Sequence, residues 1–163
     1  MIEDLFEQLT GLLGKSEQHE SFQNVILELG RPEVDVSPDK MRVCLFARLG
    51  FSIIFIDKHQ LRKCSELHFF ATSWDEGGNV VIPYRGPLPA GIVTGDGRDN
   101  VERKFGFSPR LPRARITDGP VKDYLNIYDM EPLELVFTFD RLSHQMIELK
   151  VTDLNPPDKV YIL

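Results

Sequence analysis

The chain has 163 residues, of which 42% are hydrophobic and 27% are charged, a composition typical of a soluble protein with one domain or two small ones. No run of about 18 apolar residues occurs, and the first residues are acidic, so neither a membrane span nor a secretion signal is predicted. We therefore expect a cytoplasmic protein with no membrane partner. Cys44 and Cys64 have neither metal-ligand nor C-x-x-C spacing, which predicts two reduced, structural cysteines.

The N-terminal part of the chain predicts two amphipathic helices. Apolar residues from Ile2 to Leu13 recur at spacings of three and four, which predicts a helix. A second helix is expected over residues 21–29, with Ser21 as its N-cap and Gly30 at its end. Prolines then predict an extended acidic loop over residues 33–40.

Short runs of β-branched and aromatic residues follow. Those at 43–47, 51–56 and 66–70 predict a three-stranded antiparallel meander. Residues 71–79 contain the only tryptophan and a turn signal, and residues 80–82 predict a short strand. Three prolines and two glycines in residues 83–91 predict a linker.

The last part of the chain has the same order of elements. Residues from Asp96 to Gly106 predict one helix, with Asp96 as its cap. An irregular stretch over 107–120 precedes runs at 122–127, 133–139 and 146–151, which predict a second meander. Residues 160–163 are expected to add an edge strand.

An internal repeat is indicated by matching segments. Residues 22–30 align with 98–106, residues 51–57 with 134–140 and residues 66–67 with 148–149. We predict an α+β protein with two similar halves, 1–82 and 83–163, joined at about 83–91. Each half is a helix or helix pair packed on an antiparallel three-stranded meander. One compact domain and a chance match of common strand residues are the alternatives.

Catalytic motifs are not recognisable in the sequence. No serine has the G-x-S-x-G setting, and the four histidines lack metal-ligand spacing. His68 alternates with Leu67 and Phe69, which predicts a surface or hydrogen-bonded histidine. We therefore expect a non-enzymatic protein with no catalytic residues, metal or cofactor, and keep an unrecognised hydrolase as an alternative.

Charge is distributed unevenly, with a net charge of −7 over residues 1–39, +6 over 40–122 and −5 over 123–163. Acidic ends suit protein partners better than nucleic acid, which usually binds one positive face. The basic stretch from Arg98 to Arg115 is interpreted as a solvated loop, with a protein contact and nucleic acid as alternatives. At a helix start, Gly95, Asp96, Gly97 and Arg98 form a candidate anion site, and an ordinary helix cap is the alternative.

Two short motifs resemble known bacterial proteins. The pattern Val-x-x-x-(Leu or Phe)-Gly before a proline, in 25–32 and more loosely in 101–109, resembles the BamE/SmpA type of helix-plus-sheet module. The joint over 84–92 is similar to a G-x-LP-x-GI segment of small cytoplasmic bacterial proteins, some of which look like immunity proteins of polymorphic or type VI secreted toxins. The resemblance implies a protein that binds and neutralises a cognate protein toxin of the secreted-effector type. Co-purification with the product of the neighbouring gene would test this.

Candidate partner contacts are chosen by residue type. Aromatic residues and arginine dominate interface hot spots, and acidic side chains accelerate association with basic toxins. The first candidates are Trp74, Asp75, Glu76, Tyr84 and Arg85, with Glu33, Asp35 and Asp39 as the acidic alternative. A core position is the alternative for Trp74. The second function considered is a regulatory module that binds an anion or small molecule at residues 95–98.

Overall fold

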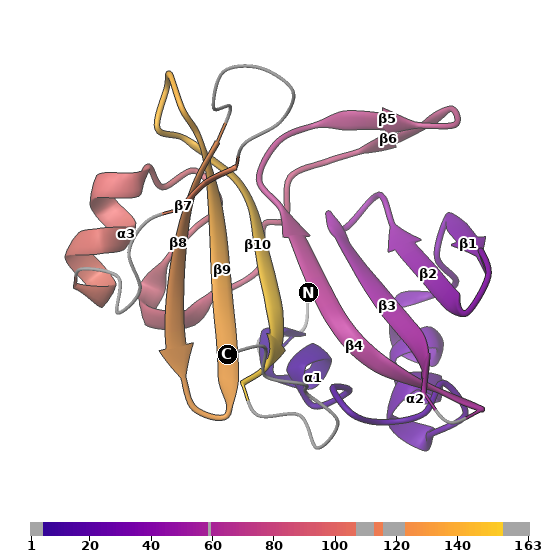
Figure 1. Ribbon diagram of the computed structural model, residues 1–163. Coiled ribbons are helices and arrows are strands. Elements are labelled where there is room, and N and C mark those ends of the chain that lie inside the picture. The colour runs from indigo at the N-terminus through magenta and orange to yellow at the C-terminus, as the bar shows by residue number, and fades with distance from the viewer. Residues whose placement is uncertain (1–4, 59, 107–112, 116–122, 155–163) are drawn as a thin grey trace.

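The computed structural model describes residues 5–58, 60–106, 113–115 and 123–154 (Figure 1). In chain order the elements are α1 (Leu5–Thr10), α2 (Glu20–Leu29), β1 (Val34–Val36), β2 (Met41–Phe46), β3 (Phe51–Lys58), β4 (Leu61–Phe70), β5 (Trp74–Glu76), β6 (Asn79–Val81), the 3-10 helix η1 (Pro89–Gly91), α3 (Arg98–Phe105), β7 (Arg113–Arg115), β8 (Asp123–Met130), β9 (Leu133–Asp140) and β10 (Met146–Asp153). The α+β class predicted from the sequence is confirmed.

One antiparallel sheet contains strands from both ends of the chain. Its order is β1-β2-β3-β4-β10-β9-β8-β7, so the meanders β2-β3-β4 and β8-β9-β10 meet where β4 pairs with β10. This seam has four register pairs, from Glu148 opposite Phe70 to Val151 opposite Leu67. The two meanders therefore form one continuous sheet.

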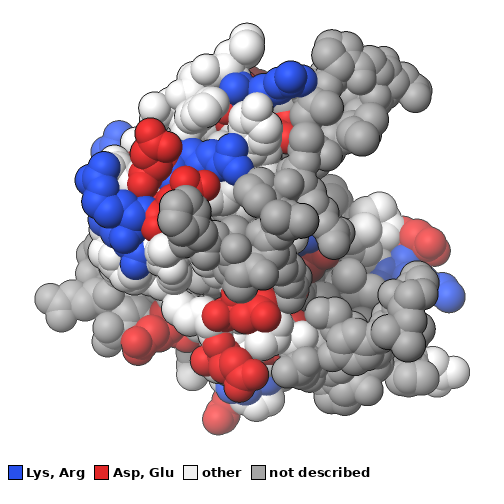
Figure 2. Space-filling view, turned by 60° about the vertical axis from the view of Figure 1, so that its left-hand side comes forward, with Lys and Arg blue, Asp and Glu red and all other residues white. Residues whose placement is uncertain are grey.

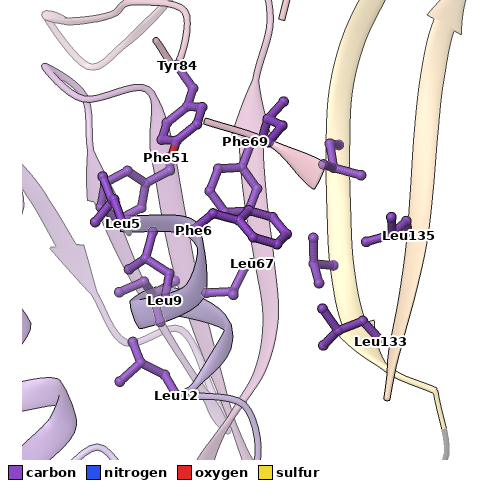
Figure 3. Close-up of a cluster of buried hydrophobic side chains, with 14 of the residues drawn as sticks. Leu5, Phe6, Leu9, Leu12, Phe51, Leu67, Phe69, Tyr84, Leu133 and Leu135 are labelled. Carbon is purple, nitrogen blue, oxygen red and sulfur yellow. The ribbon is translucent and has the colours of Figure 1, made fainter. Parts of the chain in front are cut away.

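Helix α1 lies between the two meanders (Figures 1 and 3). Leu9 and Leu12, at 0% and 1% exposure, belong to the same buried cluster as Leu67 of β4 and Leu135 of β9. Helices α2 and α3 join this cluster through Val25 and Val101, which are both fully buried. In each helix the apolar residues, spaced three and four apart, lie on the face that packs against the sheet. The strands contribute apolar side chains to the same cluster at alternate positions.

The two predicted N-caps are wrong. His19 caps α2, and its Nδ1 accepts a hydrogen bond from the backbone N–H of Ser21, which lies inside the helix. Gly97 is the N-cap of α3. The Asp96 carboxylate instead accepts hydrogen bonds from the backbone N–H of Val93 at 3.0 Å and from Lys104 Nζ at 3.1 Å. It closes the preceding turn and is not available to the first helical turn.

Short edge strands extend both meanders. β1 lies in the stretch predicted as an acidic loop, because a three-residue strand between prolines has the same sequence signature as an extended loop. β7 lies in the stretch predicted as irregular. Residues 160–163, where another edge strand was predicted, fall outside the described part of the chain.

The hairpin β5-β6 forms a separate two-stranded sheet and extends away from the main sheet (Figure 1). It is anchored by Val81, which is buried with Leu45 and Ala47, and by Trp74, whose ring packs edge-on against Phe70 at 5.4 Å. A two-stranded hairpin is marginal alone in water. This small second cluster therefore holds it in place.

Candidate functional site

Three of the predicted partner-binding residues lie together on strand β5. Trp74 is half-buried against Phe70. This position is compatible both with a core residue and with a residue that contacts a partner. The Asp75 carboxylate accepts a hydrogen bond from the backbone N–H of Gly78 at 2.9 Å and so fixes the hairpin turn. Glu76 is exposed, and Val80, opposite Asp75 on β6, is 60% exposed. Val80 and Asp75 therefore lie beside each other on one face of the hairpin, whereas Glu76 lies on the same face as Trp74.

The other two first candidates lie beyond the hairpin and differ in exposure. Tyr84 is 1% exposed, its ring packs edge-on against Phe69 at 4.8 Å, and its hydroxyl donates to the Pro87 carbonyl at 3.3 Å. Burial raises the pKa of Tyr84 to about 12. Tyr84 is therefore a core residue, whereas Arg85 is exposed.

Two members of the acidic alternative make internal contacts. The Glu33 carboxylate accepts hydrogen bonds from the backbone N–H groups that begin the β2-β3 turn, at 3.0 and 3.3 Å. Asp35 binds the Arg42 guanidinium through two hydrogen bonds of 2.9 and 2.8 Å, which lower the pKa of Asp35. Asp39 is exposed. A partner would therefore have to compete with existing bonds at two of these three acids.

The predicted anion-binding stretch lies at a cavity. This cavity of about 360 Å³ is lined by Gly95, Gly97, Arg98, Asp99, Asn100, Arg103, Ser143, His144 and Gln145. The first turn of α3 is held against the β9-β10 turn because the backbone N–H of Arg98 donates to the His144 carbonyl at 2.9 Å. Three of the four predicted residues are thus brought together, and Asp96 is not part of the lining.

Arg98 is held firmly at this cavity. Its Nε donates to Asn126 Oδ1 at 3.1 Å and lies 3.2 Å from Glu102 Oε1. Its guanidinium lies 4.5 Å from the centre of the Tyr124 ring, within cation–π range. Figure 2 shows that basic and acidic side chains are intermixed on the side of the molecule that carries α3. This arrangement suits one small anionic group better than a polyanion.

A polar cluster that sequence reasoning missed lies at the seam of the sheet. His68 Nε2 is 2.9 Å from Glu66 Oε2, and His68 Nδ1 bonds the Glu148 carboxylate. Lys150 is opposite His68 in register. The motifs Glu-x-His and Glu-x-Lys place each pair on one strand face, but the sequence does not reveal that β4 and β10 are neighbours.

The charge state of His68 follows from these contacts. Burial alone would lower the pKa of His68, but hydrogen bonds to Glu148 and Glu66 outweigh it and raise the pKa to about 9. The hydrogen bond to His68 in turn lowers the pKa of Glu66. A protonated ring with both nitrogens bonded to carboxylates has no lone pair with which to accept a proton. In this state the cluster joins the two meanders and is not a general base.

We expect the contribution of His68 to stability to depend on pH. Because its folded-state pKa is raised from 6.5 to about 9, the contribution is fully present below pH 6.5 and is lost as the pH rises through 9. Urea unfolding of the wild type and His68→Gln should differ by on the order of 2 kcal/mol at pH 6 and by clearly less above pH 9. A difference that is constant with pH would contradict the charged cluster.

Among the described residues, no group of three or more His, Cys, Asp or Glu side chains could hold a metal ion. Within the same part of the chain, every helix is too short or too polar to cross a membrane. Cys44 and Cys64 are both buried and not bonded to each other, and burial raises the pKa of the Cys44 thiol to about 12.

Solved structures similar to this chain include the two that follow, whereas no family model and no curated protein matches it. One is a DUF4309 family protein, YjgB, from Bacillus subtilis, with 18% identity, a TM-score of 0.53, and coverage of 90% of this chain and 84% of that one. The other is a cysteine-rich secretory protein, SAV1118, from Staphylococcus aureus, with 10% identity and a TM-score of 0.50. That match covers 88% of this chain but 44% of the other. At these identities the likeness concerns the fold alone.

Proposed function

We propose that the protein is a non-enzymatic binding protein, a bacterial immunity protein that neutralises a cognate toxin, and that the hairpin β5-β6 makes the main contact. One observation carries this proposal. The hairpin extends away from the main sheet and presents Val80, 60% exposed, directly beside the acidic Asp75, its cross-strand partner. An exposed apolar side chain next to an acid suits a basic protein surface, because acidic residues steer the encounter and the apolar contact stabilises the complex.

A substitution at the hairpin tests this contact. We expect Val80→Arg to weaken binding to the product of the neighbouring gene by at least about tenfold, because a cation would replace the apolar contact and repel a basic partner. The measurement is co-purification followed by a titration with the purified partner. Leu142→Arg is the matched control, because Leu142 is 93% exposed on the β9-β10 turn.

The same pair of variants separates the possible outcomes. Rescue of cells that express the neighbouring gene should be lost with Val80→Arg and kept with Leu142→Arg. Equal loss with both variants would place the contact elsewhere. Absence of any complex and of any rescue by the wild type would overturn the immunity function itself.

The second candidate function is a regulatory module that binds a small anion. The observation that favours it is the cavity, whose lining brings Arg98 and Arg103 together with Gly95, Gly97 and Asn100. A thermal-shift screen with phosphate, nucleotides and carboxylic acids tests it. If no ligand raises the melting temperature, or if Arg98→Ala leaves the response unchanged, the anion-binding function is wrong.

We also propose that the chain contains one unit twice, and that this unit consists of a helix, a short edge strand and a three-stranded meander. Val25 of α2 and Val101 of α3 are both fully buried. Five positions later, Gly30 and Gly106 end these helices with φ angles of 86° and 80°. These matches support the proposed repeat.

A cation–π contact supports the same duplication. The Arg42 guanidinium of β2 lies 5.4 Å from the Phe22 ring of α2, and the Arg98 guanidinium of α3 lies 4.5 Å from the Tyr124 ring of β8. Arg42 and Tyr124 occupy corresponding places, because each faces a phenylalanine of the central strand at the bulge of its meander. In the first unit the strand supplies the cation and the helix supplies the ring. In the second unit the helix supplies the cation and the strand supplies the ring.

A further inference from the structure

We infer that the free edge of strand β5 receives an extended segment of the partner in which basic and apolar residues alternate. This inference rests on the hairpin contact proposed above and adds the form in which the partner binds. Strand β5 then becomes the middle strand of a three-stranded sheet. In this mode of recognition, main-chain hydrogen bonds supply affinity and alternate side chains supply specificity.

The turn of the hairpin determines which backbone groups of β5 point to its free edge. Gly77 and Gly78 have φ angles of 57° and 90°, as the two central residues of a type I′ turn require. Such a turn makes the flanking pair, Glu76 and Asn79, a hydrogen-bonded pair. Bonded and non-bonded pairs alternate along an antiparallel ladder. The backbone N–H and C=O of Asp75, which belongs to the next pair, therefore point away from β6.

This edge of the hairpin is accessible. Among the described residues, β5 pairs only with β6, so these two groups of Asp75 have no strand partner. The strand nearer the main sheet is β6, because the backbone N–H of Ile82, directly after it, donates to the Ala47 carbonyl at 3.0 Å. Figure 1 shows β5 on the opposite side of the hairpin. A further strand can therefore approach β5 without meeting the main sheet.

Charge on the hairpin selects a basic segment. Residues 72–82 contain two acids, Asp75 and Glu76, and no base. On the edge strand β1, by contrast, the charge of Asp35 is compensated by two hydrogen bonds from Arg42. A basic residue opposite Asp75 would form a stabilising cross-strand pair, whereas a second copy of the hairpin would bring two more acids to the same place. The charge therefore favours a basic partner over a second copy of this chain.

Trp74 accounts for the apolar residues of the segment. Side chains alternate along a strand, so Trp74 lies on the face of β5 opposite to Asp75. It is half-buried and packs on the small cluster that anchors the hairpin. An apolar residue opposite Trp74 would extend this cluster, and aromatic side chains form favourable cross-strand pairs with β-branched ones. Basic residues on one face and apolar residues on the other give the alternating pattern.

The first test is amide hydrogen exchange of the full chain, measured by NMR with a blocked peptide of alternating lysine and valine. We expect a saturating amount of peptide to slow exchange of the Asp75 amide by about tenfold or more, because a new hydrogen bond must open first. The Val80 amide, which points to the opposite edge of the hairpin, should be unchanged. The same peptide N-methylated at each lysine keeps its charge and should have no effect, because it cannot pair with the edge.

A substitution tests the charge separately. Asp75→Asn keeps an oxygen that can accept the hydrogen bond from the backbone N–H of Gly78, and it should weaken binding of the lysine–valine peptide about two- to fivefold. Asp39→Asn, at an exposed acid outside the hairpin, is the matched control and should leave binding unchanged. Equal weakening by both variants, or equal binding of the N-methylated peptide, would reveal general charge attraction and would overturn the inference.

The purified product of the neighbouring gene separates this inference from the immunity function. A complex that slows exchange of the Asp75 amide supports both. A complex that leaves Asp75 unchanged, or that slows Val80 instead, overturns the inference and keeps the immunity function. Absence of any complex overturns both. Slower exchange at Asp75 with rising protein concentration alone would place a second copy on this edge and would also overturn the inference.

Discussion

Alanine in place of Gly50 is expected to lower the free energy of unfolding by about 3 kcal/mol or more. Gly50 has a φ of 78°, which disfavours any side chain, and an added Cβ would lie 2.3 Å from the Ile82 carbonyl oxygen and 2.4 Å from the Tyr84 backbone nitrogen. Both are backbone atoms that cannot rotate away. The backbone N–H of Phe70 also donates to the Gly50 carbonyl at 2.9 Å, so a shift here would disturb the end of β4.

Gly30→Ala is the matched control for this prediction. Gly30 has a similar φ of 86°, but no atom lies within 4 Å of the position of an added Cβ. We expect a loss of about 1 kcal/mol, from backbone conformation alone. Urea unfolding of both variants measures the difference. Equal losses would mean that the close approach of residues 82–84 to Gly50 does not contribute.

Leu9→Ala is expected to lower the free energy of unfolding by about 3 kcal/mol, because it leaves a cavity among side chains that relax only partly. Leu9 is fully buried and belongs to the cluster in which α1 contacts both meanders. Figure 3 shows it on the inner side of α1. The loss should therefore affect the join between the meanders and not only the helix.

Leu27→Ala provides the comparison, since Leu27 is a helical leucine that is 83% exposed. Its replacement should change the free energy of unfolding by less than about 0.5 kcal/mol. Calorimetry or denaturant unfolding of the two variants tests the contrast. A loss at Leu27 as large as that at Leu9 would indicate that α2 is covered by a partner copy in solution.

Sequence periodicity was sufficient for the type and order of the main elements. The spacing of three and four in α2 and the β-branched run of β3 each reflect burial of one face, which is a local property of the sequence. The predictions of the helix caps failed because a side chain that could cap a helix can also bond other groups nearby. Asp96 has an equally near partner in Lys104, and no local pattern shows which contact forms. Tyr84 lay in a proline-rich joint typical of a surface, yet the joint crosses the core.

The sequence alignment of the central strands needs a correction. Residues 51–57 placed over 134–140 match core-facing positions with positions on the other face. The core-facing residues are Phe51, Ile53 and Phe55 in β3 and Leu135, Phe137 and Phe139 in β9. A shift of one position restores the match, because side chains alternate along a strand. Both strands are apolar on both faces for part of their length, so their sequences alone did not fix this register.

The candidate site shows the same division between local and distant information. Gly95, Gly97 and Arg98 are adjacent in sequence and were recognised together. Ser143 and His144 line the same cavity, but only strand pairing in the folded sheet brings them there. The partners of His68 show this more strongly, because Glu148 lies 80 residues away.

The strand order also has a consequence for how the chain folds. Within each meander the paired strands follow one another in sequence, so their turns close short loops at a small entropic cost. Pairing of β4 with β10 must instead close a loop of about 80 residues, and such non-local contacts slow folding. We expect the meanders to form early and their docking around α1 to limit the folding rate. Substitutions that weaken the pairing within either meander should then slow refolding, because that pairing already exists in the rate-limiting transition state.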